Sequence, residues 1–159
     1  MTLTASSEAP AFPLTGDFLA GRLRQNLSLD DLKYIEGLVD TVAEYGDTAR
    51  LLARGTKTDR STILIEGYIF RTIESAGKRF ITGIHVPGDF VDLHGFALKR
   101  LDHNIDAAGR VMVGSVSHDT LRRVMRDRPG VARAMWALSC AARDDSFPTF
   151  SEGDISPKR

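Results

Sequence analysis

Cysteine is almost absent from this sequence, and its absence excludes several kinds of site. One cysteine, Cys140, occurs among the 159 residues. A single thiol cannot form an intrachain disulfide, a zinc site of several cysteines or an iron–sulfur cluster held by four cysteines of one chain. A disulfide-stapled fold is therefore excluded. The chain is long enough to be held together by a hydrophobic core instead.

An excess of one charge and a long hydrophobic run are missing as well. Lys and Arg number 21, as do Asp and Glu, so the overall charge gives no reason to bind nucleic acid or acidic lipid. No apolar run approaches the roughly 20 residues that a membrane span requires. Residues 1–13 lack both the positive charge and the apolar segment of a secretory signal. With 42% hydrophobic and 26% charged residues, the composition is that of a single globular domain, which we expect to be cytoplasmic.

A helix is predicted near the N-terminus, over residues 28–42. Its apolar residues follow helical spacing. Ser28 is a suitable N-cap, and Asp31 stands three residues later as its capping-box partner. We expect residues 1–18, before this helix, to be a flexible N-terminus.

Two further helices are predicted near the C-terminus. Residues 120–128 place apolar side chains on one face behind Asp119. Pro129 then opens another helix, because proline suits a first helical turn and not an interior. We expect this helix to span residues 129–143 and to be followed by a flexible acidic tail over residues 144–159.

The middle of the chain has the pattern of an all-β structure. Short apolar runs alternate there with turns that contain glycine. Many short strands separated by turns predict a sandwich or a barrel. The expected strands lie at residues 62–65, 68–73, 80–86 and 111–116.

The order of these segments resembles that of a known sensor domain. Residues 55–59 match a glycine turn, residues 63–71 a pair of apolar strands around a glycine, and Pro87-Gly88-Asp89-Phe90 a characteristic turn. Together, residues 28–143 resemble the cyclic-nucleotide-binding-like domain of Crp/Fnr transcription regulators. The resemblance implies a mainly β fold with flanking helices, a double-stranded β-helix (jelly-roll) barrel followed by a C-terminal dimerisation helix. The domain would span residues 19–143.

The resemblance also implies a ligand site just after the Pro-Gly-Asp turn. In the family a short helix holds a cyclic phosphate through backbone N–H groups, a glutamate binds the ribose and an arginine pairs with the phosphate. The candidate ligand-binding residues here are Gly88, Asp92, Leu93, His94, Gly95, Arg100 and His103.

This sequence departs from the family at the positions that bind the nucleotide. Val91-Asp92 stands where the family has Gly-Glu, although an ungapped alignment places Leu93 at the glutamate. Residues 104–108 contain no arginine, and Arg100 comes several residues early. Asp106 would repel a phosphate. These departures count against a cyclic nucleotide, and the sequence predicts no cofactor with certainty.

Metal binding and catalysis receive little support from the sequence. His94 and His103 flank the expected ligand helix near Asp102, and metals use such groups. Turn residues and a partly buried histidine explain the same pattern, so we predict no metal site. A cupin-type metal enzyme would require a His-x-His pair, and the sequence contains none. The sequence also lacks the Gly-x-Ser-x-Gly motif of a catalytic serine and the P-loop of a nucleotide-binding site. We therefore predict that the chain is not an enzyme.

The last predicted helix suggests a homodimer. Its apolar stripe needs a cover, and symmetric pairing of two copies would provide one. The family normally continues into a winged helix-turn-helix, which the 16 residues after Arg143 are too few to form. We therefore expect DNA binding only if that part is present elsewhere. The residues expected at the dimer interface are Val131, Met135, Leu138 and Ala142.

Two functions remain open at this point. The first is a bacterial regulatory domain that senses a small-molecule effector and moves the dimer helix between two arrangements. The second is a stand-alone dimeric interaction module that has the same fold without a ligand. The sequence names no effector, and we favour the first function.

Overall fold

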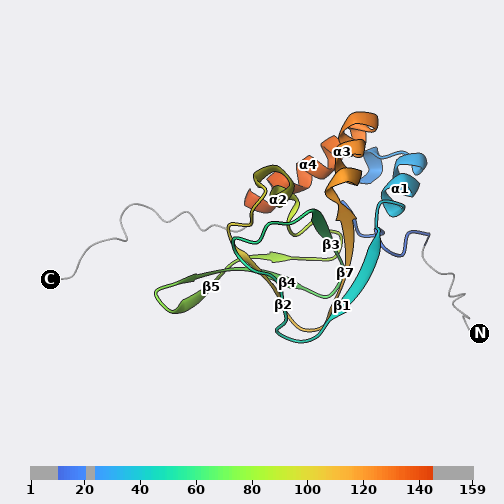
Figure 1. Cartoon of the computed structure of the whole chain (residues 1–159). Helices are drawn as coiled ribbons and strands as arrows, with labels where there is room; N and C mark the ends of the chain where they lie inside the picture. Colours follow the sequence, from blue (N-terminus) through green and yellow to red (C-terminus); the bar gives the residue numbers. More distant parts are fainter. Residues whose placement is uncertain (1–10, 21–23, 145–159) are drawn as a thin grey trace, which may run out of the picture.

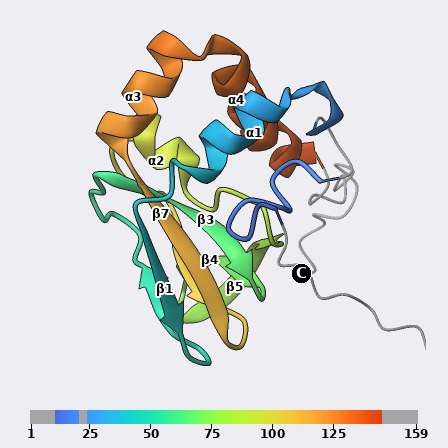
Figure 2. The same ribbon diagram turned by 90° about the vertical axis from the view of Figure 1, so that its right-hand side faces the viewer.

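The described part of the chain is built from two antiparallel sheets with helices gathered at one end. The computed structural model describes residues 11–20 and 24–144, with side chains described up to residue 137. Within these residues one sheet has the strand order β1-β7-β3 and the other β2-β6-β4-β5. Figure 1 and Figure 2 show α1, α3 and α4 together at the same end of the sheets. The arrangement confirms the predicted mainly β, jelly-roll type of fold with flanking helices.

The elements follow one another in a simple order along the chain. The strands are β1 (Thr41–Tyr45), β2 (Arg50–Leu52), β3 (Arg60–Glu66), β4 (Ile69–Ser75), β5 (Lys78–His85), β6 (Asn104–Ala107) and β7 (Val111–Ser117). The helices are the short η1 (Arg24–Asn26), α1 (Leu29–Glu36), α2 (Leu93–Leu98), α3 (His118–Asp127) and α4 (Pro129–Asp144). Among the described residues no helix is both long and apolar enough to cross a membrane.

The first helix begins where predicted but ends earlier. Ser28 and Asp31 form the expected capping box, with the Ser28 hydroxyl accepting from the Asp31 N–H at 3.1 Å. The helix stops at Glu36, and residues 41–45 form β1, which pairs with β7. The predicted helix over residues 28–42 is therefore wrong beyond Glu36. Cross-strand pairing there overrides a hydrophobic spacing that is compatible with a helix.

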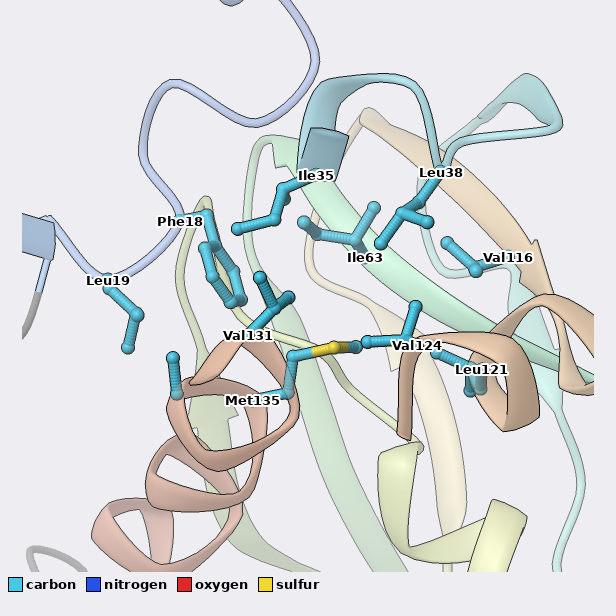
Figure 3. Close-up of a cluster of buried hydrophobic side chains, with 11 residues drawn as sticks. Phe18, Leu19, Ile35, Leu38, Ile63, Val116, Leu121, Val124, Val131 and Met135 are labelled. Atoms are coloured by element: carbon cyan, nitrogen blue, oxygen red, sulfur yellow. The ribbon is translucent and has the colours of Figure 1, made fainter. Parts of the chain in front are cut away.

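One hydrophobic cluster holds the helices on the sheets, and Figure 3 shows it. Side chains of α1, β3, α3 and α4 meet the segment before α1 in this cluster, and Met135 extends toward Val124. Full burial of each such side chain stabilises the fold by roughly 1.5–3 kcal/mol. A second cluster lies between the sheets, around Leu64, Ile69 and Ile105. The labelled members of the first are Phe18, Leu19, Ile35, Leu38, Ile63, Val116, Leu121, Val124, Val131 and Met135.

This cluster corrects two residues of the expected dimer interface, Val131 and Met135. Val131 and Met135 are only 1% and 4% exposed, because their own chain covers them. They therefore present no surface to a second copy. Trp136, the next residue of α4, is 59% exposed. Leu138 and Ala142 lie outside the residues whose side chains are described.

The segment before α1 also belongs to the packed domain. Phe18 is fully buried. The Glu36 carboxylate accepts hydrogen bonds from the backbone N–H groups of Leu14 and Thr15, both at 2.9 Å. The expected flexible N-terminus over residues 1–18 is corrected for this part, because these contacts fasten it to α1. Residues 1–10 and 145–159 lie outside the described residues.

Gly88, a candidate ligand residue, lies in close contact with the backbone of this segment. Its φ is +91°, which favours glycine, and a Cβ built on it would lie 2.1 Å from the backbone oxygen of Asp17. Its N–H donates to the Leu64 carbonyl at 2.8 Å. Gly88 therefore has a structural role, which is to let residues 17–18 cross the turn closely.

Gly88→Ala is expected to destabilise the domain more than Gly77→Ala. Both glycines have a positive φ, in the left-handed region, but nothing lies within 4 Å of a Cβ built on Gly77. The control substitution therefore costs only the backbone strain, about 1–2 kcal/mol. Overpacking against Asp17 adds roughly 1–3 kcal/mol for Gly88→Ala. Urea unfolding of both variants measures the difference, and equal losses would contradict the close approach.

Candidate functional site

A cavity lies where the sheets meet the helices. Its volume is about 300 Å³, and it is lined by Arg71 of β4, His85 of β5 and residues of α2, α3 and α4. Most of the lining is apolar, with Phe90 and Phe96 among its side chains. Apolar cavities with a few converging polar groups are typical ligand sites. The polar side chains of the lining are Arg71, His85, His94 and Asp102.

A buried carboxylate sets the position of α2, which forms one wall of the cavity. Asp92 is 0% exposed and accepts hydrogen bonds from the Thr62 backbone N–H at 2.6 Å and from the Thr62 hydroxyl at 3.2 Å. Burial raises the pKa of Asp92 to about 7, while the Thr62 hydrogen bonds act in the opposite direction. Asp92 does not line the cavity. Its role is to tie α2 to β3, which corrects its expected place among the ligand-binding residues.

The structure divides the remaining candidate ligand residues into two groups. Leu93 and His94 line the cavity. Gly95 is buried elsewhere on α2, and a Cβ there would lie 3.4 Å from side-chain atoms of Leu101 and Thr58. Arg100 is exposed, and its guanidinium donates to the Gly55 carbonyl at 3.4 Å. Neither Gly95 nor Arg100 is part of the lining.

His103 lies beside His94 and shares a carboxylate with it. The two imidazole centroids are 4.7 Å apart. One carboxylate oxygen of Asp102 is 2.5 Å from His103 Nδ1 and 3.7 Å from His94 Nε2. The fold thus brings together two histidines that are nine residues apart in the sequence.

Both imidazoles are held in their neutral form. Burial, reinforced by His103 and the positive charge of Arg71, lowers the pKa of His94 to about 4. Burial and Arg71 lower the pKa of His103 as well, against the opposing effect of Asp102. Burial acts to raise the pKa of Asp102, but its hydrogen bond to His103 and the electrostatic influence of the two neighbouring rings hold it below its usual value. At neutral pH the group is therefore two neutral imidazoles beside one carboxylate.

Asp106, which stands near the family's expected arginine, is a sheet residue. It is buried in β6 and accepts hydrogen bonds from Arg50 at 2.8 Å and from Thr72 at 2.5 Å. Arg79 lies 3.3 Å from the same carboxylate. Burial would raise the pKa of Asp106, but the hydrogen bonds of Arg50 and Thr72 outweigh it and lower the pKa. Asp106 joins four strands, and it does not line the cavity.

Sequence reasoning did not find Arg71, His85 or Phe96 as cavity residues. They come from β4, β5 and α2 and converge only in the folded chain. A signal was present for His85, a polar residue that ends an apolar strand just before the Pro-Gly-Asp turn. Arg71 and Phe96 carried no local signal that separates them from ordinary strand and helix residues.

Comparisons with known proteins identify the fold of this domain. No family model matches the sequence, and no curated protein does either. Among solved structures, a protein from Geobacter metallireducens described as cyclic-nucleotide-binding has 17% identity and a TM-score of 0.60, over 76% of this chain and 88% of that chain. The chain has the fold of a cyclic-nucleotide-binding domain.

Two regulators share this fold with the domain. The Thermus thermophilus catabolite activator protein matches with 12% identity and a TM-score of 0.66, over 75% of this chain and 56% of that protein. The N-terminal domain of a transcriptional regulator from Streptomyces coelicolor matches with 18% identity and a TM-score of 0.61, over 82% of this chain and 94% of that domain. The domain thus spans about half of the activator and nearly all of the isolated N-terminal domain.

Asp92→Asn is expected to change how the stability of the domain depends on pH. The folded pKa of about 7 lies above the ordinary value of 3.8. Between these two values the folded state binds more protons than the unfolded state, so stability falls as the pH rises. Asparagine keeps the acceptor oxygen for Thr62 and does not titrate. Relative to the wild type, the variant should gain about 2–3 kcal/mol between about pH 5 and about pH 8.

Urea unfolding at both pH values, in buffer with EDTA, measures this gain. The control is Asp30→Asn, which changes a carboxylate whose side chain is 73% exposed. A constant difference between Asp92→Asn and the wild type at the two pH values would show that the buried carboxylate does not titrate in this range.

Proposed function

We propose that the chain is the effector-sensing domain of a bacterial transcription regulator of the Crp/Fnr kind. One observation carries the proposal: Leu121, Val124 and Met135 belong both to the cavity lining and to the core that holds α3 and α4 on the sheets. An effector in the cavity therefore touches the side chains that set the position of these helices. The likeness to a catabolite activator and to the N-terminal domain of a regulator supports the same role.

The effector is a mainly apolar molecule with one group that accepts hydrogen bonds or carries negative charge. The aromatic and aliphatic lining favours apolar surface, and Arg71, His85 and His94 supply the polar contacts. A volume of about 300 Å³ suits a small molecule. A cyclic nucleotide fits less well, since Arg100 lies outside the lining and the Asp92 carboxylate occupies the start of α2.

The signal passes from the cavity to α4. A ligand shifts a two-state equilibrium only by its difference in affinity for the two states. A hundredfold preference for one arrangement of α3 and α4 would shift the equilibrium by about 2.7 kcal/mol. Two copies of the chain associate through the exposed side of α4, where Trp136 lies. DNA is contacted by a helix-turn-helix present elsewhere.

A stand-alone interaction module is the second candidate. Leu98, Met125 and Trp136 line the cavity and are also 63%, 47% and 59% exposed. Exposed apolar side chains that lie together mark a surface for a partner. In this alternative these three exposed side chains bind a partner protein, and the cavity binds no ligand.

Fluorescence of Trp136 is expected to report occupancy of the cavity, since the chain has a single tryptophan and it lies in the lining. Anilinonaphthalene sulfonate combines apolar rings with one negative charge and serves as the probe. We expect saturable quenching of Trp136, with energy transfer to the probe. Equal concentrations of cAMP and cGMP should leave the emission unchanged.

Replacing either of two alanines by phenylalanine tests where the probe binds. Ala97 is an exposed lining residue, so Ala97→Phe narrows the cavity and should weaken probe binding at least about tenfold. Ala43→Phe changes an exposed alanine of β1 and should have no effect. Saturable cAMP binding would establish a nucleotide sensor instead. A folded chain that binds none of these compounds would favour the interaction module.

The oligomeric state should depend on Trp136. Light scattering of the purified chain is expected to give the mass of a dimer, and Trp136→Lys should shift it to a monomer, because a lysine charge opposes burial in an interface. Leu29→Lys is the matched control, since Leu29 of α1 is similarly exposed at 61%. A dimer that survives Trp136→Lys but not Leu29→Lys would move the interface to α1.

A further inference from the structure

Three side chains beside the cavity have the donor set of a metal site. One ring nitrogen of His94, one of His103 and a carboxylate oxygen of Asp102 all lie within 4.8 Å of one another. They come from α2 and from the bend that precedes β6. The tie between Asp92 and Thr62 and the pairing of β6 with β4 hold these two segments. The cluster is thus positioned by the fold on both sides.

The two imidazoles have nitrogen atoms with no hydrogen-bond partner. His94 Nε2 and His103 Nε2 are buried and accept or donate no hydrogen bond within the described part of the chain. The side chain of His103 is only 4% exposed, so water does not freely supply the missing partner. Buried polar atoms in native proteins are nearly always satisfied, and those that are not call for an explanation. A bound cation is such an explanation, because neutral imidazole binds metals through its free lone pair.

We propose that His94, Asp102 and His103 bind a divalent transition-metal ion of the zinc class. Two imidazole nitrogens and one carboxylate oxygen suit zinc and neighbouring ions, whereas Mg²⁺ and Ca²⁺ prefer oxygen donors alone. Donors placed tetrahedrally around zinc are about 3.3–3.5 Å apart. The 3.7 Å between Asp102 Oδ1 and His94 Nε2 is already close to this. The site goes beyond the proposed sensing function and does not depend on it.

The electrostatics of the site favour one ion and leave room for another ligand. Asp102 supplies a negative charge next to both imidazoles, and it offsets the positive charge of Arg71 that acts on them. Its side chain is 72% exposed, which gives an ion a route from solvent. Three protein donors leave a coordination position open. His94 and Asp102 also line the cavity, so the proposed site borders the cavity.

Calorimetric titration of the full chain with zinc chloride tests the site, after treatment with EDTA and removal of any histidine tag. We expect one ion per chain to bind saturably to the wild type. Cobalt chloride should give visible absorption typical of mixed nitrogen and oxygen coordination. Magnesium and calcium chloride should give no saturable heat. None of these readouts requires an effector or DNA, so a failure here leaves the proposed sensing function untouched.

Matched variants locate the ion. Asp102→Asn and His94→Gln should each weaken zinc binding at least about tenfold, since even the partners of metal ligands contribute roughly 10–100-fold. The controls Asp30→Asn and His118→Gln should bind as the wild type does; His118 is a buried histidine whose Nε2 lies 3.3 Å from the Ser61 hydroxyl. The variant Cys140→Ser tests whether zinc binds instead to the single thiol of the chain.

Two results would overturn the assignment. One is a wild-type chain that binds no zinc saturably. The other is zinc binding that Asp102→Asn and His94→Gln leave unchanged, or that Cys140→Ser removes. Asp102 is exposed, so its variant should remain folded even where His94→Gln does not. Circular dichroism of each variant before the titration confirms the fold.

Discussion

The Asp92 carboxylate, buried between β3 and α2, is the contact on which the candidate site depends. It accepts the backbone N–H of Thr62 and therefore does not cap its own helix. A short helix has little stability of its own, so its place is set by tertiary contacts of this kind. With α2 held against β3, His94 lies beside His103 and Phe96 lies in the cavity wall. The α2 wall of the cavity and the position of His94 both depend on this tie.

A second constraint is that the cavity and the helical core share side chains. Leu121, Val124 and Met135 contribute to both, so the packing that holds α3 and α4 is also the surface a ligand would meet. Close-packed interiors respond to added volume by moving between discrete arrangements. This gives a sensing role a physical basis in the chain. The histidine cluster borders the same cavity through His94 and Asp102 and has a separate chemistry.

Local sequence signals predicted the elements that depend on local contacts. The Ser28–Asp31 capping box, the helix that starts at Pro129 and the strands around Gly67 are all present. The predicted helix over residues 28–42 is wrong beyond Glu36, because β1 is defined by its pairing with β7 and not by its own spacing. Strands β2 and β6 were not predicted either. They are short and are held by pairing with each other and with β4.

The sequence by itself determined the class of fold, the capping box at Ser28 and the start of the last helix at Pro129. These depend on composition, on periodicity and on residues close together in the chain. Only the tertiary structure decided what the polar residues do. It buried Asp92 against Thr62, paired Asp106 with Arg50, and placed His94 beside Asp102 and His103. Such pairings join residues from different elements, and their distances are set by how sheets and helices pack, which no local pattern encodes.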